Sequence, residues 1–359
     1  GWKSNFSIYD AADQKRLMSL VCNDLDLDPK RYQPGALLHW VSDQKNELRD
    51  PEQVAAETRN KLEETYASVY ALYQRRLREA NALDFDDLIM STVRLFQTFP
   101  DVRETYRRRF RHVLVDEYQD TNVVQNELVM LLGAGHRNVC VVGDSDQSIY
   151  RFRGADIRNI LEFERSFPDT TIVVLDQNYR STQTILDAAN AVITKNLGRK
   201  PKELWTDAGS GDPITRFRAD DEDDEARWAV GQLRRMHDGG RPWADMAIFY
   251  RTNAQSRVLE ESLARSGIPY KVVGGTRFYD RREVKDAVAY LKAVVNPADE
   301  VAVKRCLNTP KRGVGDASVA RLDAWAASQG ITFTDALRRS ADAGVGGRAV
   351  NGIASFLEV

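Results

Sequence analysis

The feature that most constrains the fold is an apolar run, Val113-Leu114-Val115, that ends abruptly in Asp116 and Glu117. Such a run is typical of a strand buried in a parallel sheet, and ligands bind at the carboxyl edge of these sheets. Carboxylates at that edge are suited to hold Mg²⁺ through water and to polarise an attacking water molecule. The alternative is a strand that ends in a solvated acidic turn, and the pair alone does not decide between the two.

The middle of the chain alternates between short β-branched runs and helical segments. Strands are predicted at residues 113–115, 139–142, 172–175, 214–218, 246–250 and 270–273, with helices at 123–132, 157–167, 224–236 and 255–266. This alternation predicts an α/β fold with a parallel sheet.

Helical patterns occupy both ends of the chain. We expect Asp10 to cap a helix that runs to Leu25, and Asp84 to begin one that runs through Leu95. Further helices are predicted at 37–48 and 51–80, and the aromatic stripe of the latter is expected to lie in a core. After Gly274-Gly275 only helices are predicted.

Composition bounds the class of protein. A chain of 359 residues with 42% hydrophobic and 29% charged residues is expected to form two or more soluble domains. No apolar run approaches the roughly 20 residues that span a bilayer, and no signal peptide is evident. The three cysteines form no Cys-x-x-Cys pair, which favours a reducing compartment without structural zinc. A net charge of −2 does not predict nucleic-acid binding but permits a local basic groove.

The polar residues that directly follow a predicted strand form a strand exit, and Asp116 and Glu117 belong to the first. A second strand exit lies in the segment from Val141 to Ala155, VVGDSDQSIYRFRGA. Its Gln147 can hydrogen-bond a phosphate. Tyr150 and Phe152 then alternate with arginines that include Arg153, and single-stranded nucleic acid requires this combination of stacking faces and charge. The alternative is a loop whose aromatic side chains lie in the core.

A third strand exit carries Tyr179 and Arg180, followed by Ser181 and Thr182 as candidate helix caps. Arg180 is therefore expected at a helix N-terminus, where it could bind a phosphate, while Tyr179 could stack on a nucleobase. In the alternative, Arg180 pairs with a nearby carboxylate.

These segments together resemble a known family. DEYQDT, VVGDSDQSIYRFRGA and LDQNYRST, in this order, resemble motifs II, III and IV of the UvrD/PcrA/Rep-type superfamily 1 DNA helicases. LDFDDLI, GGTRFYDRREVKDAVAYL and TPKRGVGDAS extend the resemblance over the chain. It implies parts of two RecA-like parallel-sheet domains with two all-helical inserts. The expected division is a first insert at 1–92, part of the first motor domain at 93–175, part of the second at 176–275, and the start of the second insert at 276–359.

The resemblance also implies roles for single residues. Asp116 would bind Mg²⁺ through water, Glu117 would activate water, Gln147 and Arg180 would contact the γ-phosphate of ATP, and Tyr179 would stack on adenine. Tyr150, Phe152 and Arg153 would contact single-stranded DNA. Lys311, Arg312, Gly313 and Gly315 would contact duplex phosphates, although a simple inter-helix turn explains this stretch equally well. Many relatives carry Trp at Phe152 and Phe at Tyr118, and both changes keep an aromatic ring.

The activity implied by the resemblance is ATP-dependent unwinding of DNA in the 3′ to 5′ direction, with ATP and Mg²⁺ as cofactors. The implied partners are single-stranded DNA, junctions of single- and double-stranded DNA, and proteins of repair or replication in a bacterial cytoplasm, with no membrane. No Gly-x-x-x-x-Gly-Lys-Ser/Thr loop occurs here. The family places that loop upstream, so we expect the central part of a helicase, inactive by itself. Two alternatives stay open: the motor of a helicase–nuclease subunit, and a non-hydrolysing DNA-binding scaffold.

Overall fold

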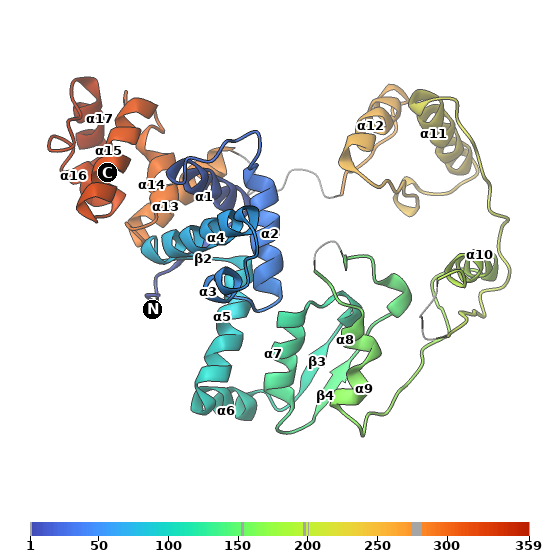
Figure 1. Ribbon diagram of the computed structural model, residues 1–359. Helices are drawn as coiled ribbons and strands as arrows, with labels where there is room; N and C mark the ends of the chain where they lie inside the picture. Colours follow the sequence, from blue (N-terminus) through green and yellow to red (C-terminus); the bar gives the residue numbers. More distant parts are fainter. Residues whose placement is uncertain (1, 152–153, 197–198, 200, 274–281, 359) are drawn as a thin grey trace. The chain divides into compact units, whose positions relative to one another are not determined.

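The chain divides into two units in the computed structural model, which describes residues 2–151, 154–196, 199, 201–273 and 282–358. The first unit comprises Gly1–Leu175, Lys195–Lys202 and Asp286–Val359, and the second comprises Asp176–Thr194 and Glu203–Lys285 (Figure 1). Short parallel strand pairs and many helices make the fold mixed α/β, as predicted.

A bundle of helices opens the first unit. Its members are α1 (Ala11–Asp24), α2 (Pro34–Asn46), α3 (Pro51–Ala56), α4 (Lys61–Glu79) and α5 (Phe85–Thr98). The predicted caps are confirmed, because the Asp10 carboxylate accepts hydrogen bonds from the amides of Ala12 and Asp13, and the Asp84 carboxylate accepts one from the amide of Asp87. Tyr70, Tyr73 and Leu77 of the predicted stripe lie in the core of this bundle.

Two predictions for this region are wrong. The segment 51–80 is not one helix, because the chain breaks after α3 and Asn60 caps α4 separately. The region is not purely helical either, since β1 (Ser7–Tyr9) pairs in parallel with β2 (Ala82–Asp84). Each of these strands has three residues, too few for a two-residue alternation to stand out against the surrounding helical pattern.

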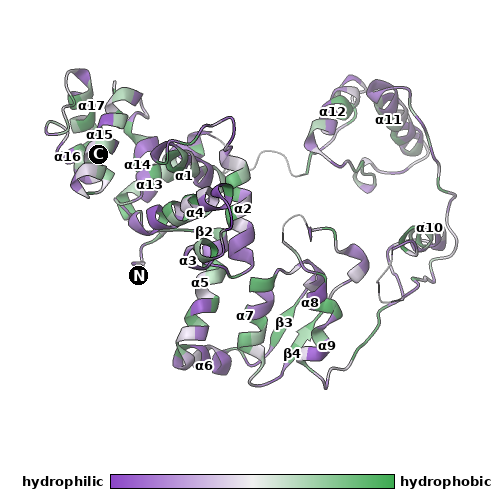
Figure 2. Cartoon of the chain, viewed as in Figure 1, coloured by the Kyte–Doolittle hydropathy of each residue, from purple (hydrophilic) through white to green (hydrophobic). Residues whose placement is uncertain are grey.

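The sheet that carries the first two strand exits follows in the same unit. After α6 (Pro100–Arg109), β3 (Val113–Val115) pairs in parallel with β4 (Val139–Val141), with Leu114 opposite Cys140. The predicted helix between them is α7 (Val123–Gly133). The predicted helix 157–167 is two short helices, α8 (Arg158–Leu161) and α9 (Phe163–Ser166). Figure 2 shows β3 and β4 in the hydrophobic colour. Val113 and Val115 pack against the core, but Leu114 between them is 76% exposed, so β3 is not buried on both faces as expected.

The other four predicted strands are wrong for the described residues. Within the described chain, the apolar runs 172–175, 214–218, 246–250 and 270–273 form no strand, and Leu175 is 78% exposed. A strand requires a neighbour for its backbone groups, and none pairs with these runs here. In the second unit only one isolated parallel bridge, between Gln177 and Trp205, is described.

The second unit contains α10 (Gln183–Ile193), α11 (Glu222–Asp238) and α12 (Ser256–Arg265). The last two correspond to the helices predicted at 224–236 and 255–266. They pack together around Val230, Leu263 and Ile268.

Helices alone form the described part of the carboxyl-terminal region, as predicted. They are α13 (Arg282–Val295), α14 (Glu300–Leu307), α15 (Asp316–Gln329), α16 (Phe333–Arg338) and α17 (Arg348–Leu357). A polar seam joins them to the bundle within the first unit: the Tyr9 hydroxyl donates to Asp299 Oδ1 at 2.7 Å, and Asn296 Nδ2 donates to the carbonyl of Ala80 at 2.8 Å. No helix in the described ranges has the length and apolar character needed to cross a membrane.

Candidate nucleotide and nucleic-acid site

The end of β3 brings Asp116 and Glu117 to solvent. Asp116 Oδ1 accepts a hydrogen bond from the Glu117 amide at 2.9 Å, and Glu117 has a φ of 51°, in the left-handed region. Few residues other than glycine adopt that region, and such conformations concentrate at functional sites. The chain then returns to the sheet, because the Tyr118 amide donates to the carbonyl of Val142 at 2.9 Å. The turn therefore exposes both carboxylates at the carboxyl edge of the sheet.

The side chain of Tyr118 anchors this turn to the core. This side chain is fully buried and meets Phe163 edge-on, with 5.7 Å between ring centroids. Its hydroxyl donates to Asn126 Oδ1, and burial raises the pKa of Tyr118 to about 12. The ring is therefore a neutral structural anchor next to the two exposed acids.

The end of β4 presents Gln147 beside the first exit. A 3₁₀ turn (Ser145–Gln147) follows Asp144, and Gln147 Nε2 donates to Asp144 Oδ2 at 2.8 Å. Tyr150, on the same segment, is 37% exposed. The predicted DNA contacts Phe152 and Arg153 lie outside the described residues.

Two basic side chains that the sequence did not predict, Arg199 and Lys202, bind the acidic residues after β4. Arg199 contacts Asp146 through both oxygens, with Nε–Oδ1 at 2.9 Å and Nη2–Oδ2 at 2.8 Å, and Lys202 forms an ion pair with Asp144. Burial acts to raise the pKa of Asp144, but the hydrogen bonds from Lys202 and Gln147 outweigh it, so that pKa lies below its usual value. Asp144 is therefore ionised at neutral pH. Arg199 lies 53 residues from Asp146 in the sequence, and no sequence pattern predicts a contact between residues so far apart.

In the second unit, Asn178 shapes the turn that carries Tyr179 and Arg180. Asn178 Oδ1 accepts the amides of Arg180 at 2.9 Å and Ser181 at 2.7 Å. Tyr179 is 85% exposed, as a stacking ring would be, and Arg180 is exposed as well. The structure places these two residues in a different unit from Asp116 and Glu117.

Thr182 occupies the N-cap position of α10, as predicted, but its hydroxyl makes no capping hydrogen bond. The amides of Gln183 and Thr184 donate instead to the carbonyls of Gly209 and Ser210, at 2.9 and 3.1 Å. Because these carbonyls occupy the amides, this helix N-terminus is not open to an anion, and a phosphate contact here would rest on the Arg180 guanidinium.

The glycine-rich turn at 309–315 joins α14 to α15. Gly313 has a φ of 75°, and Lys311 is exposed at its tip. The Arg312 guanidinium, by contrast, donates to the carbonyls of Cys306 at 3.0 Å and Thr309 at 3.1 Å, and to the Tyr290 hydroxyl at 2.6 Å. Arg312 thus caps the end of α14, which leaves Lys311 and the backbone around Gly313 and Gly315 as the groups open to a phosphate.

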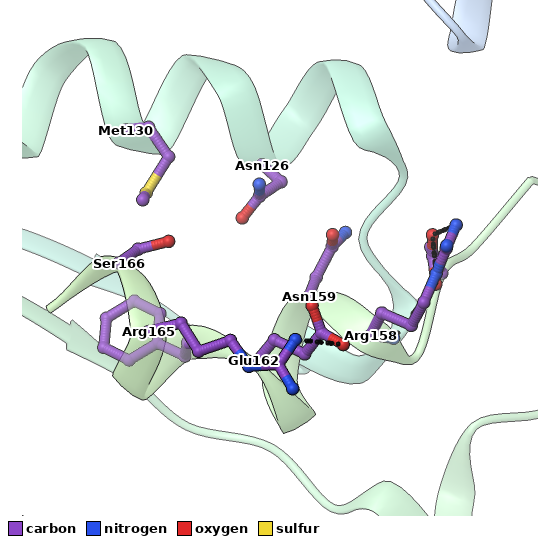
Figure 3. A pocket seen from close by; sticks show the side chains of 9 residues that line it. Asn126, Met130, Arg158, Asn159, Glu162, Arg165 and Ser166 are labelled. Carbon is purple, nitrogen blue, oxygen red and sulfur yellow. Dashed lines mark hydrogen bonds and ion pairs between the residues drawn. The ribbon is translucent and has the colours of Figure 1, made fainter. Parts of the chain in front are cut away.

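A separate hollow of about 240 Å³ lies between α7 and the helices α8 and α9 (Figure 3). Asn126 and Met130 face Asn159, Glu162 and Ser166 across it. Its charged side chains are paired, Arg165 with Glu162 at 2.9 Å and Arg158 with Asp156 at 2.5 Å. None of the predicted site residues lines this hollow.

Comparison with known proteins agrees with the motifs. Residues 1–168 match the model of the UvrD/REP helicase N-terminal domain, and residues 173–343 match the UvrD-like helicase C-terminal domain. The chain is 54% identical over 373 aligned residues to the ATP-dependent DNA helicase UvrD1 of Mycobacterium tuberculosis (strain ATCC 25618 / H37Rv), an alignment that covers 100% of this chain and 48% of the relative. It is 47% identical to the ATP-dependent DNA helicase PcrA of Bacillus subtilis (strain 168), with 100% of this chain and 49% of that relative covered.

The chain spans about half the length of the curated relatives it matches. The two family models cover residues 1–168 and 173–343 and include the segments DEYQDT, VVGDSDQSIYRFRGA and LDQNYRST. On these grounds the chain belongs to the UvrD-like helicase family.

Proposed function

We propose that this protein acts as an ATP-dependent DNA helicase that moves along single-stranded DNA from 3′ to 5′ and unwinds duplexes. The observation that carries the proposal is the pair of exposed carboxylates, Asp116 and Glu117, at the end of β3, beside the Gln147 turn at the end of the neighbouring parallel strand. Family membership supports it, because the relatives are named ATP-dependent DNA helicases.

The residues at this edge suit a magnesium nucleotide. Mg²⁺ prefers oxygen ligands, keeps several waters, and is commonly held by one or two carboxylates together with phosphates. Asp116 offers an exposed carboxylate of this kind, with one oxygen engaged by the Glu117 amide. When bound, Mg²⁺ would neutralise charge on the phosphates.

Within this proposal each side chain has one task. Glu117 orients and polarises the attacking water, and Gln147 donates a hydrogen bond to the terminal phosphate. Arg180 offers a guanidinium to the developing phosphate charge, and Tyr179 stacks on the base.

DNA would be bound by separate surfaces. Tyr150, Phe152 and Arg153 combine stacking faces and charge for a single strand. Lys311 and the backbone amides around Gly313 and Gly315 would bind duplex phosphates, on an insert that begins at residue 276. The expected partners are junctions of single- and double-stranded DNA, in repair or replication.

Strand displacement by the full-length protein tests the proposal. Duplexes with a 3′ tail, a 5′ tail or blunt ends would be incubated with ATP and Mg²⁺. We expect unwinding of the 3′-tailed duplex alone, together with ATP hydrolysis that single-stranded DNA stimulates. DNA binding without hydrolysis would instead indicate a scaffold, and preference for the 5′ tail would overturn the direction.

A further inference from the structure

Gln119 is a buried glutamine whose side chain joins the two strand exits of the first unit. It is 1% exposed. Its Nε2 donates to Glu117 Oε2 at 2.8 Å, and its Oε1 accepts from the backbone amide of Asp144 at 2.9 Å. The orientation of the amide is unambiguous, because a flipped amide would point its oxygen at a carboxylate and its N–H₂ at another N–H.

The backbone next to Asp144 is shaped for this contact. A Cβ added to Gly143 would lie 2.5 Å from Gln119 Oε1 and 2.8 Å from Ile160 Cδ1. Any side chain at residue 143 would therefore push the glutamine amide away from the end of β4. Glycine at this position allows the amide to sit directly against the turn that leads to Gln147.

Asp144 extends the connection. Its carboxylate accepts from the Asp146 amide at 2.9 Å and from Gln147 Nε2 at 2.8 Å, and it pairs with Lys202. Gln119 thus contacts both the Glu117 carboxylate and the Asp144 backbone, and the Asp144 carboxylate in turn contacts the Gln147 side chain.

The direction of the Glu117 carboxylate depends on its hydrogen bond from Gln119. The Glu117 side chain is exposed, and its backbone is held in a left-handed conformation that a glutamate does not prefer. In the described part of the chain, the Gln119 amide donates a side-chain hydrogen bond to this carboxylate. Without that donor, the carboxylate would be free to rotate in solvent.

We propose that Gln119 is a positioning residue that fixes the direction of the Glu117 carboxylate and ties it to the Gln147 turn. This inference rests on the proposed function, in which Glu117 orients water and Gln147 contacts the terminal phosphate. Gln119 itself touches no reacting atom. Its effect is on the rate of hydrolysis, since small displacements of a catalytic group cost up to about 100-fold in rate.

The experiment replaces Gln119 by leucine, which has similar bulk and lacks both hydrogen-bonding groups. Gln74→Leu is the matched control, since Gln74 is another buried glutamine that donates to a carboxylate, Asp87, at 3.0 Å. In the full-length protein, Q119L is expected to lower kcat for DNA-stimulated ATP hydrolysis about 10- to 100-fold, with the KM for ATP and the Kd for single-stranded DNA unchanged.

A second readout needs no enzymatic activity. Amide hydrogen exchange at Asp144 is expected to accelerate in Q119L, because that amide loses its acceptor, and to stay at the wild-type rate in Q74L.

Glu117→Gln distinguishes a failure of the Gln119 positioning role from a failure of the proposed function. If E117Q abolishes turnover while Q119L keeps the wild-type kcat, the positioning role is wrong and the proposed function stands. A fall in kcat, ATP binding and DNA binding together in Q119L, matched in Q74L, would show a general folding defect and would also overturn the role. Normal turnover by E117Q would overturn the proposed function itself.

Discussion

Two regions of the chain have equally clear hydrophobic patterns but differ in burial. They are the amino-terminal bundle and the four apolar runs at 172–175, 214–218, 246–250 and 270–273. In the bundle the pattern becomes core: Leu77 is 0% exposed, and Tyr70 and Tyr73 lie beside it. In the runs it stays at the surface, where Val173 is 74% exposed and no strand forms in the described chain.

The difference lies in where backbone hydrogen bonds find their partners. A helix satisfies its own N–H and C=O groups within four residues, so an amphipathic sequence needs only one apolar neighbour. A strand satisfies them only through another strand, which must arrive from elsewhere in the chain. The β3–β4 pair meets this requirement, and the strand exits that it orders carry the best-defined part of the candidate site.

The largest expected effect lies inside the bundle, at Lys45. Its ammonium is fully buried and pairs with Asp84 at 2.7 Å and Asp87 at 2.8 Å. Burial acts to lower the pKa of Lys45, but the two carboxylates outweigh it and raise that pKa. Lys45→Met would leave both acids buried without a cation and is expected to lower the free energy of unfolding by about 3–5 kcal/mol. Urea denaturation would measure the loss.

Lys61→Met is the control for that variant, because Lys61 pairs with Glu64 in full solvent. It is expected to change the free energy of unfolding by less than about 1 kcal/mol. Equal losses in the two variants would contradict the view that the buried charges cross-link the bundle.

A matched pair of leucines tests the comparison directly. Leu77→Ala removes a side chain that is 0% exposed, whereas Leu175→Ala removes one that is 78% exposed. We expect a loss of about 2–5 kcal/mol for the first and less than about 0.5 kcal/mol for the second, by the same denaturation measurement. A loss above 1.5 kcal/mol at Leu175 would mean that the run 172–175 is packed in solution.

A smaller effect is expected at Asp299, in the seam between the bundle and the carboxyl-terminal helices. Burial raises the pKa of Asp299. Hydrogen bonds that include those from the Ala302 amide and the Tyr9 hydroxyl act to lower this pKa but offset the effect of burial only in part. The folded state therefore holds this proton more tightly than the unfolded state, in which the pKa is about 3.9. As pH rises from about 4 through the raised pKa, this group lowers the free energy of unfolding, and above that pKa the penalty stays constant.

Asp299→Asn keeps an oxygen for both donors and removes the charge. The difference in unfolding free energy between D299N and the wild-type protein is therefore expected to shift in favour of D299N as pH rises through that window. Denaturation at a series of pH values would measure it. A difference independent of pH would show that Asp299 does not titrate differently in the two states.

Local interactions were predictable from the sequence and distant ones were not. The caps at Asp10 and Asp84 involve residues within one turn, so their pattern is visible in a short window. The exits after β3 and β4 were predictable because an apolar run that ends in acids is itself local. The Gln119 contact with the Asp144 amide joins residues 25 positions apart. Nothing in the composition of DEYQDT distinguishes Gln119 from a solvent-exposed glutamine.

The measurement that tests the account most directly is single-turnover ATP hydrolysis by Glu117→Gln in the full-length protein with saturating single-stranded DNA. Cleavage is expected to be abolished while ATP and DNA still bind, because the substitution keeps the shape of the side chain and removes the carboxylate that polarises water. Glu52→Gln, at an exposed acid of α3, is expected to keep the wild-type rate. Wild-type cleavage by E117Q would contradict the assignment of the β3 exit as the hydrolytic site.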